Sequence, residues 1–117
     1  MKLVLLATVA GALAVLVPVA SGAPPTLKGT VGPGFTITLT HLGKKVLKLK
    51  SGTYTFKVAD KSSIHNFHLI GKGLNKATSV SGTGTKTWTI TLKPGKVVYQ
   101  CDPHHLSGMK GSFRVTS

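Results

Sequence analysis

Apolar side chains alternate with polar ones along much of this chain, and this alternation limits the fold more than any other feature. The clearest case is the stretch 87–92, in which Trp88, Ile90 and Leu92 alternate with threonines. Successive side chains of a β-strand point to opposite faces, so a period of two predicts strands with one buried face. The same period recurs at Phe35, Ile37 and Leu39, at Tyr54, Phe56 and Val58, at Val97, Tyr99 and Cys101, and at Phe113 and Val115.

Turn-forming residues separate these stretches. Glycine occurs between them, often beside proline or serine, at 32–34, 43, 51–52, 71–73, 82–84, 94–95, 108 and 111. Beyond residue 22, no stretch sustains the apolar period of a helix. The pattern therefore predicts an all-β sandwich or small barrel of about seven to eight short strands.

The first 22 residues differ from the rest of the chain. They are mostly apolar, and Lys2 is the only charged residue before Lys28. A charged start, an apolar run to Val17 and small residues after Pro18 predict a secretory signal peptide over 1–22, with the cleavage site left open. An uncleaved membrane anchor is the alternative, because the run is just long enough to span a bilayer. Both alternatives place the remaining chain outside the cytoplasm, secreted or in the periplasm or cell envelope.

Length and charge narrow the possibilities further. With 117 residues the chain holds one domain, which we expect at 31–117 after a linker and first extended segment at 23–30. Its net charge is +13, and its two acids, Asp60 and Asp102, lie far apart in sequence, which argues against catalysis by a carboxylate pair. Aromatic residues make up 6% of the chain, too few for a platform that stacks nucleic-acid bases.

One short segment gathers three side chains that bind metals. Cys101, His104 and Met109 offer a thiolate, an imidazole and a thioether between two predicted strands. A second imidazole must come from elsewhere, and the stretch 63–69 supplies candidates. The single cysteine excludes an intramolecular disulfide. Because a free thiol outside the cell oxidises readily, either burial as a small apolar residue or metal ligation must account for it.

The donor set favours copper. Two histidines and one cysteine in a plane, with a distant axial methionine, form the geometry of electron-transfer copper sites. Zinc would prefer more thiolates or a carboxylate in place of the thioether. Calcium and magnesium require oxygen ligands that this segment does not offer.

The same segment also carries a family resemblance. The spacing Cys-x-x-His-x-x-x-x-Met at Cys101, His104 and Met109 resembles the ligand loop of the cupredoxins, small blue (type 1) copper proteins such as plastocyanin, pseudoazurin and azurin. Tyr99, two residues before the cysteine, and Pro103, directly before the histidine, also fit that loop. The resemblance covers most of residues 30–117 and implies a Greek-key β-sandwich or barrel around one type 1 copper ion.

The upstream half of the motif is the pair His65-Asn66, which resembles the ligand histidine of cupredoxins and the asparagine that follows it. The resemblance implies a backbone N–H of Asn66 near the thiolate, as a partner that orients the site. It implies that the metal ligands are His65, Cys101, His104 and Met109.

Three further histidines need an interpretation. On a regular strand His65 and His68 would face opposite sides, so they should not both reach one metal, and His68 is interpreted as a packed or surface residue. His105 gives the loop an alternative spacing and is interpreted as an exposed neighbour at the mouth of the site. His41 ends a predicted strand and is interpreted as a surface residue.

The resemblance implies one-electron transfer between Cu(II) and Cu(I) by a monomer that is not an enzyme and takes no small-molecule substrate. In the family, the second histidine of the motif reaches the surface within an apolar patch and passes the electron, a role that here falls to His104. A copper carrier or storage protein with the same ligands is the alternative. A fragment of a multicopper oxidase or nitrite reductase is disfavoured, because Gln100 and Asp102 rather than histidines flank Cys101. Ligand spacing argues against a metal-free adhesion domain.

The strong positive charge suggests two kinds of partner. Scattered lysines would speed the encounter with an acidic redox protein and make it dependent on salt. They would equally hold the protein on an anionic cell envelope. Nucleic acid is not expected, because the chain has no basic helix and no motif that reads bases.

Overall fold

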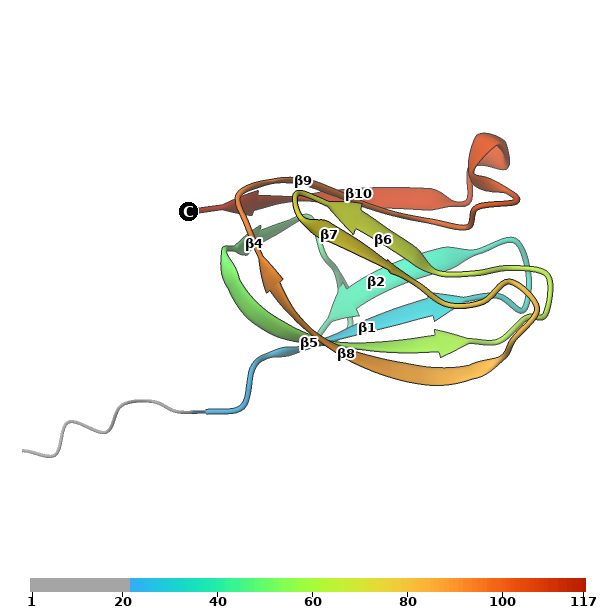
Figure 1. Ribbon diagram of the computed structural model, residues 1–117, viewed down its shortest axis with the longest axis horizontal. Helices are drawn as coiled ribbons and strands as arrows, with labels where there is room; N and C mark the ends of the chain where they lie inside the picture. Colours follow the sequence, from blue (N-terminus) through green and yellow to red (C-terminus); the bar gives the residue numbers. More distant parts are fainter. Residues whose placement is uncertain (1–21) are drawn as a thin grey trace, which may run out of the picture.

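The computed structural model describes residues 22–117, so the predicted signal peptide, 1–22, lies outside the described residues except for Gly22. The described part consists of β-strands and one short 3₁₀ helix (Figure 1). The elements are β1 (Thr26–Val31), β2 (Ile37–His41), β3 (Lys44–Lys45), β4 (Lys48–Lys50), β5 (Gly52–Asp60), β6 (His68–Gly71), β7 (Leu74–Ala77), β8 (Gly84–Leu92), β9 (Gly95–Gln100), η1 (His105–Ser107) and β10 (Lys110–Thr116). Within residues 22–117, no helix is long and apolar enough to span a bilayer.

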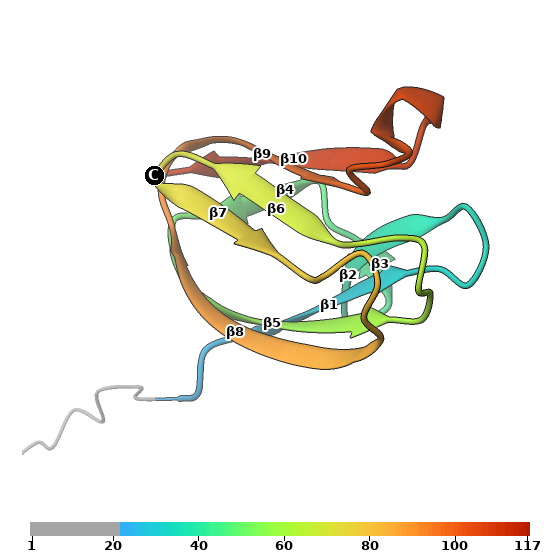
Figure 2. The same ribbon diagram turned by 45° about the vertical axis from the view of Figure 1, so that its right-hand side comes forward.

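The strands form two five-stranded sheets that face each other (Figures 1 and 2). One sheet has the order β3-β2-β1-β5-β8 and the other the order β4-β10-β9-β6-β7. Two strand pairs are parallel, β1 with β5 and β4 with β10. The predicted Greek-key β-sandwich is confirmed. β3 and β4 have only two and three residues, and the other eight strands account for the predicted number.

The alternation of the sequence directs apolar side chains into the space between the sheets. Phe56 of β5 and Tyr99 of β9 are fully buried there, and the Tyr99 ring stacks on Phe67 with ring centroids 5.7 Å apart. On the outer face of the first sheet, Thr53 of β5 and Thr91 of β8 are paired across the strands, and their hydroxyls lie 2.9 Å apart. The period of two therefore predicted which face of these strands is buried.

Near the start of the domain, one residue departs from the alternating pattern. Residues 26–31 form β1, which lies between β2 and β5 with Leu27 and Val31 fully buried and begins within 23–30, where a linker and first extended segment were expected. Phe35 was expected to share the buried face of Ile37 and is instead 65% exposed in the turn before β2. The Gly-Pro-Gly turn at 32–34 accounts for this, because the chain rejoins the sheet only at Ile37.

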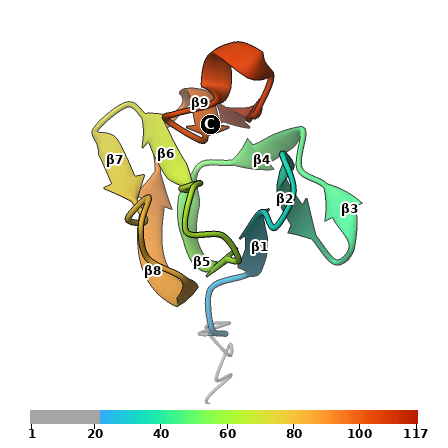
Figure 3. The ribbon, with the colours of Figure 1, turned by 90° about the vertical axis from the view of Figure 1, so that its right-hand side faces the viewer.

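The loops gather at two ends of the sandwich (Figure 1). We call one the η1 end; it holds the loops 32–36, 61–67, 78–83 and 101–109, and Figure 3 looks at the sandwich from this side. We call the other the C-terminal end; it holds the turns 42–43, 51, 72–73 and 93–94, together with residues 22–25 and the C-terminus. Every residue of the predicted metal site therefore lies at the η1 end.

Candidate metal centre

The alternation of β9 carries Cys101 into the interior just beyond the last residue of the strand. Val97, Tyr99 and Cys101 are all buried, and Cys101 has no exposed surface. Its backbone N–H donates to the carbonyl of Met109 at 3.0 Å, and its carbonyl accepts the N–H of His104 at 3.1 Å. The segment 101–109 is therefore a closed loop, and its two ends are fastened together next to the cysteine.

The rest of this loop is short and tightly hydrogen-bonded. The carbonyl of His104 accepts the N–H groups of Ser107 at 2.9 Å and Met109 at 3.3 Å. Helix η1 ends at Gly108, which has a φ of 96°, a left-handed conformation that glycine adopts without strain. Met109 then returns to the interior with 1% of its surface exposed. These bonds fold the loop back on itself, so that the backbones of His104 and Met109 stay close to Cys101.

Three predicted ligands meet in space. The donor atoms of His65, Cys101 and His104 all lie within 4.8 Å of one another. The Cys101 Sγ is 3.6 Å from the Nδ1 of His65 and 3.5 Å from the Nδ1 of His104. The two Nδ1 atoms are 3.0 Å apart. His65 comes from the loop between β5 and β6, so this cluster joins segments that are far apart in sequence.

The spacing of these atoms fits a metal ion at their centre. Metal–nitrogen bonds of about 2.0 Å and a metal–sulfur bond of about 2.3 Å in a trigonal plane place each nitrogen about 3.7 Å from the sulfur. The observed distances of 3.5 and 3.6 Å agree with this. The Nδ1 atoms are closer than the plane requires, at the 3.0 Å of a hydrogen bond between imidazoles. The donor atoms of the cluster, one sulfur and two imidazole nitrogens, are of the kinds that copper sites use.

The two imidazoles differ in their exposure. His65 is fully buried, and its Nε2 has no hydrogen-bond partner in the described part of the chain. His104 is partly exposed. One imidazole is therefore enclosed by protein, while the other forms the link between the cluster and the surface.

A network of hydrogen bonds holds the loop between β5 and β6, which carries His65. The Thr78 hydroxyl accepts the Phe67 N–H and donates to the carboxylate of Asp60, both at 2.8 Å. The Thr78 N–H in turn donates to the Phe67 carbonyl at 3.0 Å. Asp60 and Thr78 are both buried, so this network fixes the backbone two residues beyond His65. Asp60 thus has a structural role.

The residues that follow the two ligands also bind each other. Asn66 accepts the backbone N–H of Asp102 at 2.7 Å through its side-chain oxygen and donates to the Asp102 carboxylate at 2.9 Å. Asn66 was expected to act through its own backbone N–H near the thiolate, which stays a prediction. The structure adds this side-chain link, which sequence reasoning missed because nothing near Asp102 in the sequence identifies its partner.

His68 lies outside the cluster and binds Asp102 from the other side. Its Nδ1 is 2.8 Å from the Asp102 carboxylate, and its Nε2 contacts the side-chain oxygen of Asn75. Burial alone lowers the pKa of His68, but the bonds to Asp102 and Asn75 and the charge of Asp102 outweigh burial and raise that pKa. Burial likewise acts to raise the pKa of Asp102, while hydrogen bonds from Gln100, Asn66 and His68 lower it. His68 is thus a half-buried residue outside the three-residue cluster.

The other two histidines are placed as follows. His105 begins η1, is partly exposed and is not part of the three-residue cluster. His41 is the last residue of β2, at the C-terminal end of the sandwich, and is partly exposed. His41 therefore has no part in the cluster.

Phe35 is a residue of the site that sequence reasoning missed. Its ring meets the rings of both His65 and His104 edge to face, each with centroids 4.9 Å apart. Because Phe35 is also 65% exposed, it stands between the two imidazoles and water. The preceding Gly-Pro-Gly turn is the signal that could have separated Phe35 from the strand pattern.

Comparison with solved structures shows the same fold in other proteins. Auracyanin from the photosynthetic bacterium Roseiflexus castenholzii aligns with a TM-score of 0.57 and 24% identity, covering 82% of this chain and 100% of its own. Rusticyanin from Thiobacillus ferrooxidans aligns with a TM-score of 0.60 and 21% identity, covering 82% and 79%. Auracyanin A, a "blue" copper protein from Chloroflexus aurantiacus, aligns with a TM-score of 0.54 and 19% identity, covering 80% and 100%.

No protein-family model and no curated protein matches the sequence. At these identities the likeness to solved structures establishes the fold, which is the cupredoxin-like β-sandwich.

Proposed function

We propose that this protein is a one-electron carrier that holds a single type 1 copper ion with His65, Cys101 and His104 in a plane and Met109 as a weak axial ligand. The observation that supports it best is the convergence of two imidazole Nδ1 atoms on one buried sulfur, at the 3.5 and 3.6 Å that a shared metal ion requires. A structural cysteine with unrelated histidines nearby would have no reason to direct both Nδ1 atoms at its sulfur.

The surrounding residues suit such a site because they restrict movement of the ligands. Bound copper would supply a single electron by cycling between Cu(II) and Cu(I). The backbone bonds within 101–109 and the link between Asn66 and Asp102 hold the ligands in one arrangement, so little has to move when the charge of the site changes. Cys101 has no exposed surface, so the protein keeps water away from the sulfur.

The electron would leave through His104. This partly exposed imidazole lies beside Phe35 at the η1 end, where Ile64 and Leu106 are also exposed, by 55% and 89%. An apolar surface of this kind allows a redox protein to approach closely without a bound substrate. The proposal therefore assigns no catalytic turnover to the protein.

Three observations outside the cluster support the proposal. Solved structures with this fold include a "blue" copper protein. The loop spacing at 101–109 is that of the plastocyanin and pseudoazurin ligand loops, which we propose as the nearest type of site. The apolar N-terminal segment has the pattern of a signal peptide, which would export the domain to the compartment that we propose for its partner.

The test is the visible and electron-paramagnetic-resonance spectrum of the protein after addition of Cu(II). We expect an intense blue thiolate-to-copper band with a small copper hyperfine splitting. Cys101→Ser should abolish both features, whereas His105→Gln and His68→Gln, which leave the proposed ligands in place, should retain the blue band. A colourless protein, or a band unchanged in Cys101→Ser, contradicts the proposal. A blue protein that loses its copper within seconds to a weak chelator would favour the carrier alternative.

A further inference from the structure

The loops around the proposed copper site carry little charge. The four loops of the η1 end contain one lysine, Lys61, and one acid, Asp102. The other twelve lysines of residues 22–117 are exposed on the strands and on the turns of the C-terminal end, and one of them, Lys110, directly follows Met109. Most of the positive charge therefore lies outside these four loops and is free to contact another surface.

The most unusual residue of the C-terminal end is Leu42, at the tip of the turn between β2 and β3. It is 89% exposed and has a φ of 51°, a left-handed conformation that a branched apolar residue rarely adopts. Gly43 beside it has a φ of 79°. Turns with two consecutive residues of positive φ favour the sequence Asn-Gly. Leucine is therefore disfavoured here, both because of its backbone conformation and because its apolar side chain is exposed to water. A contact with something apolar would account for it.

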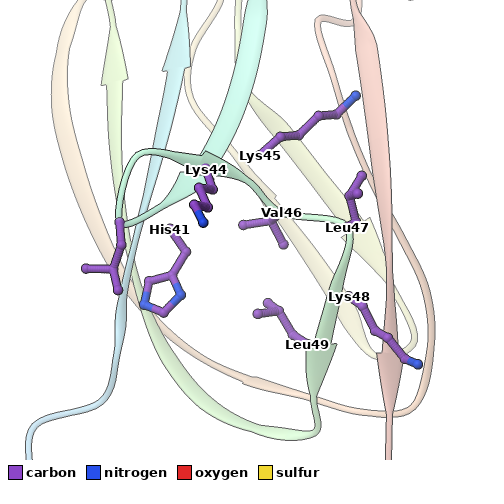
Figure 4. A pocket seen from close by; sticks show the side chains of 8 residues that line it. His41, Lys44, Lys45, Val46, Leu47, Lys48 and Leu49 are labelled. Carbon is purple, nitrogen blue, oxygen red and sulfur yellow. The ribbon is translucent and has the colours of Figure 1, made fainter.

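Leu42 belongs to a surface that also carries a second exposed leucine and three exposed lysines. Leu47 is 67% exposed, and Lys44, Lys45 and Lys48 are exposed around it. We call these five residues the Leu–Lys surface. The protein is hollowed at this place, and Figure 4 shows Val46 and Leu49 directed into the hollow while Lys48 points away from it.

We propose that the Leu–Lys surface binds an anionic lipid bilayer. Lysines next to exposed leucines suit the boundary between headgroups and acyl chains, where the charges meet lipid phosphates and the leucines enter the apolar layer. The chain also enters the domain at the C-terminal end, through residues 22–25, directly after the apolar N-terminal segment. Of the two partners suggested by the charge, the exposed leucines among these lysines thus favour the cell envelope.

This orientation has a consequence for electron transfer. The Leu–Lys surface lies on β3, β4 and the segments beside them, whereas His104 and Phe35 lie in loops of the η1 end, so a bilayer on this surface does not have to cover them. The copper site then remains open to a redox protein. Binding of the domain to the bilayer does not require bound copper.

The experiment uses residues 22–117, which contain every strand and every core side chain that the structure describes, with circular dichroism to confirm folding. We expect co-sedimentation with vesicles of equal phosphatidylglycerol and phosphatidylcholine, and none with pure phosphatidylcholine, at about 0.1 M salt. Neutralising one lysine at such a surface weakens partitioning about fivefold, so Lys44→Gln with Lys45→Gln should weaken it about 25-fold. The control pair Lys61→Gln with Lys86→Gln removes the same charge nearer the η1 end and should change it less than about fivefold.

A second variant tests the leucine by itself. Leu42→Asn should weaken binding to the anionic vesicles about tenfold, because an apolar side chain is lost from the lipid boundary. It should at the same time raise the melting temperature, because asparagine tolerates the left-handed backbone. Absence of vesicle binding, equal loss in both lysine pairs, or unchanged binding of Leu42→Asn would each overturn the proposal.

Discussion

Asn66 and Asp102, which directly follow the proposed ligands His65 and Cys101, are joined by two reciprocal hydrogen bonds of 2.7 and 2.9 Å. Asn66 is almost fully buried, with 2% of its surface exposed. The pair links the loop before β6 to the loop after β9, so one side chain sets the distance between an imidazole and the sulfur. Partners of this kind orient ligands without touching the metal.

The first prediction concerns this link. Asn66→Ala removes both bonds, which should cost about 1–3 kcal/mol of folding stability, because each such bond contributes about 0.5–1.5 kcal/mol. Copper affinity should fall about 10- to 100-fold, because the two ligand loops lose their common support. Chelator competition measures the affinity and thermal melting measures the stability. Asn75→Ala, which removes an amide bonded to His68 outside this link, is the control, and equal copper affinity in the two variants would refute the assigned role.

The second prediction concerns Phe35. Phe35→Ala uncovers the edges of both imidazoles, so water reaches the site and favours the more highly charged Cu(II) form. The reduction potential should fall and copper should dissociate faster, whereas Phe35→Leu, which keeps an apolar cover, should lie close to the unmodified protein. Because Phe35 is 65% exposed, the melting temperature of the metal-free protein should change little. Voltammetry measures the reduction potentials of both variants. Identical potentials for Phe35→Ala and Phe35→Leu would show that Phe35 does not shield the site.

The third prediction separates packing from ligation at Met109. Met109→Leu keeps an apolar side chain of similar volume in a position that is 1% exposed, so the fold should be retained with a loss of less than about 1.5 kcal/mol. Loss of a weak sulfur donor should raise the reduction potential while the blue band persists, because the thiolate and both imidazoles remain. A spectrum and potential identical to those of the unmodified protein would mean that Met109 only fills space.

The fourth prediction concerns pH. The pKa of His68 is raised in the folded protein, mainly by Asp102, so its contribution to stability is complete below its unfolded pKa and is lost as pH rises through the folded pKa. The pKa of Asp102 is lowered, so its contribution is present above its unfolded pKa and is lost as pH falls through the folded value. The pair therefore stabilises the fold most at mildly acidic pH.

Thermal melting of the metal-free protein at about pH 5 and about pH 8 checks this. The difference in melting temperature between the unmodified protein and His68→Gln should be larger at the lower pH. His41→Gln removes a histidine that forms no ion pair with a carboxylate within residues 22–117, so it should show no such dependence. An equal difference at both pH values would mean that the ion pair contributes nothing.

Much of the fold follows from local sequence pattern. Alternation in β5, β8, β9 and β10 identified their buried faces, because a strand has only two faces and one of them must exclude water. The pattern was less informative at Phe35, where two apolar neighbours at the right spacing concealed a turn. It was also silent about β1, in which Gly29 stands between Leu27 and Val31 and interrupts the apolar period.

The sequence by itself determined the kinds of donor atom, since one cysteine, one methionine and two histidines at the right spacing leave few other metals to consider. Only the tertiary structure decided which imidazoles meet the sulfur, that Phe35 covers them, and that Asn66 and Asp102 join their loops. Each of these is a relation between segments separated by tens of residues. Such relations depend on how two sheets pair and face each other, and no local spacing in the chain records that arrangement.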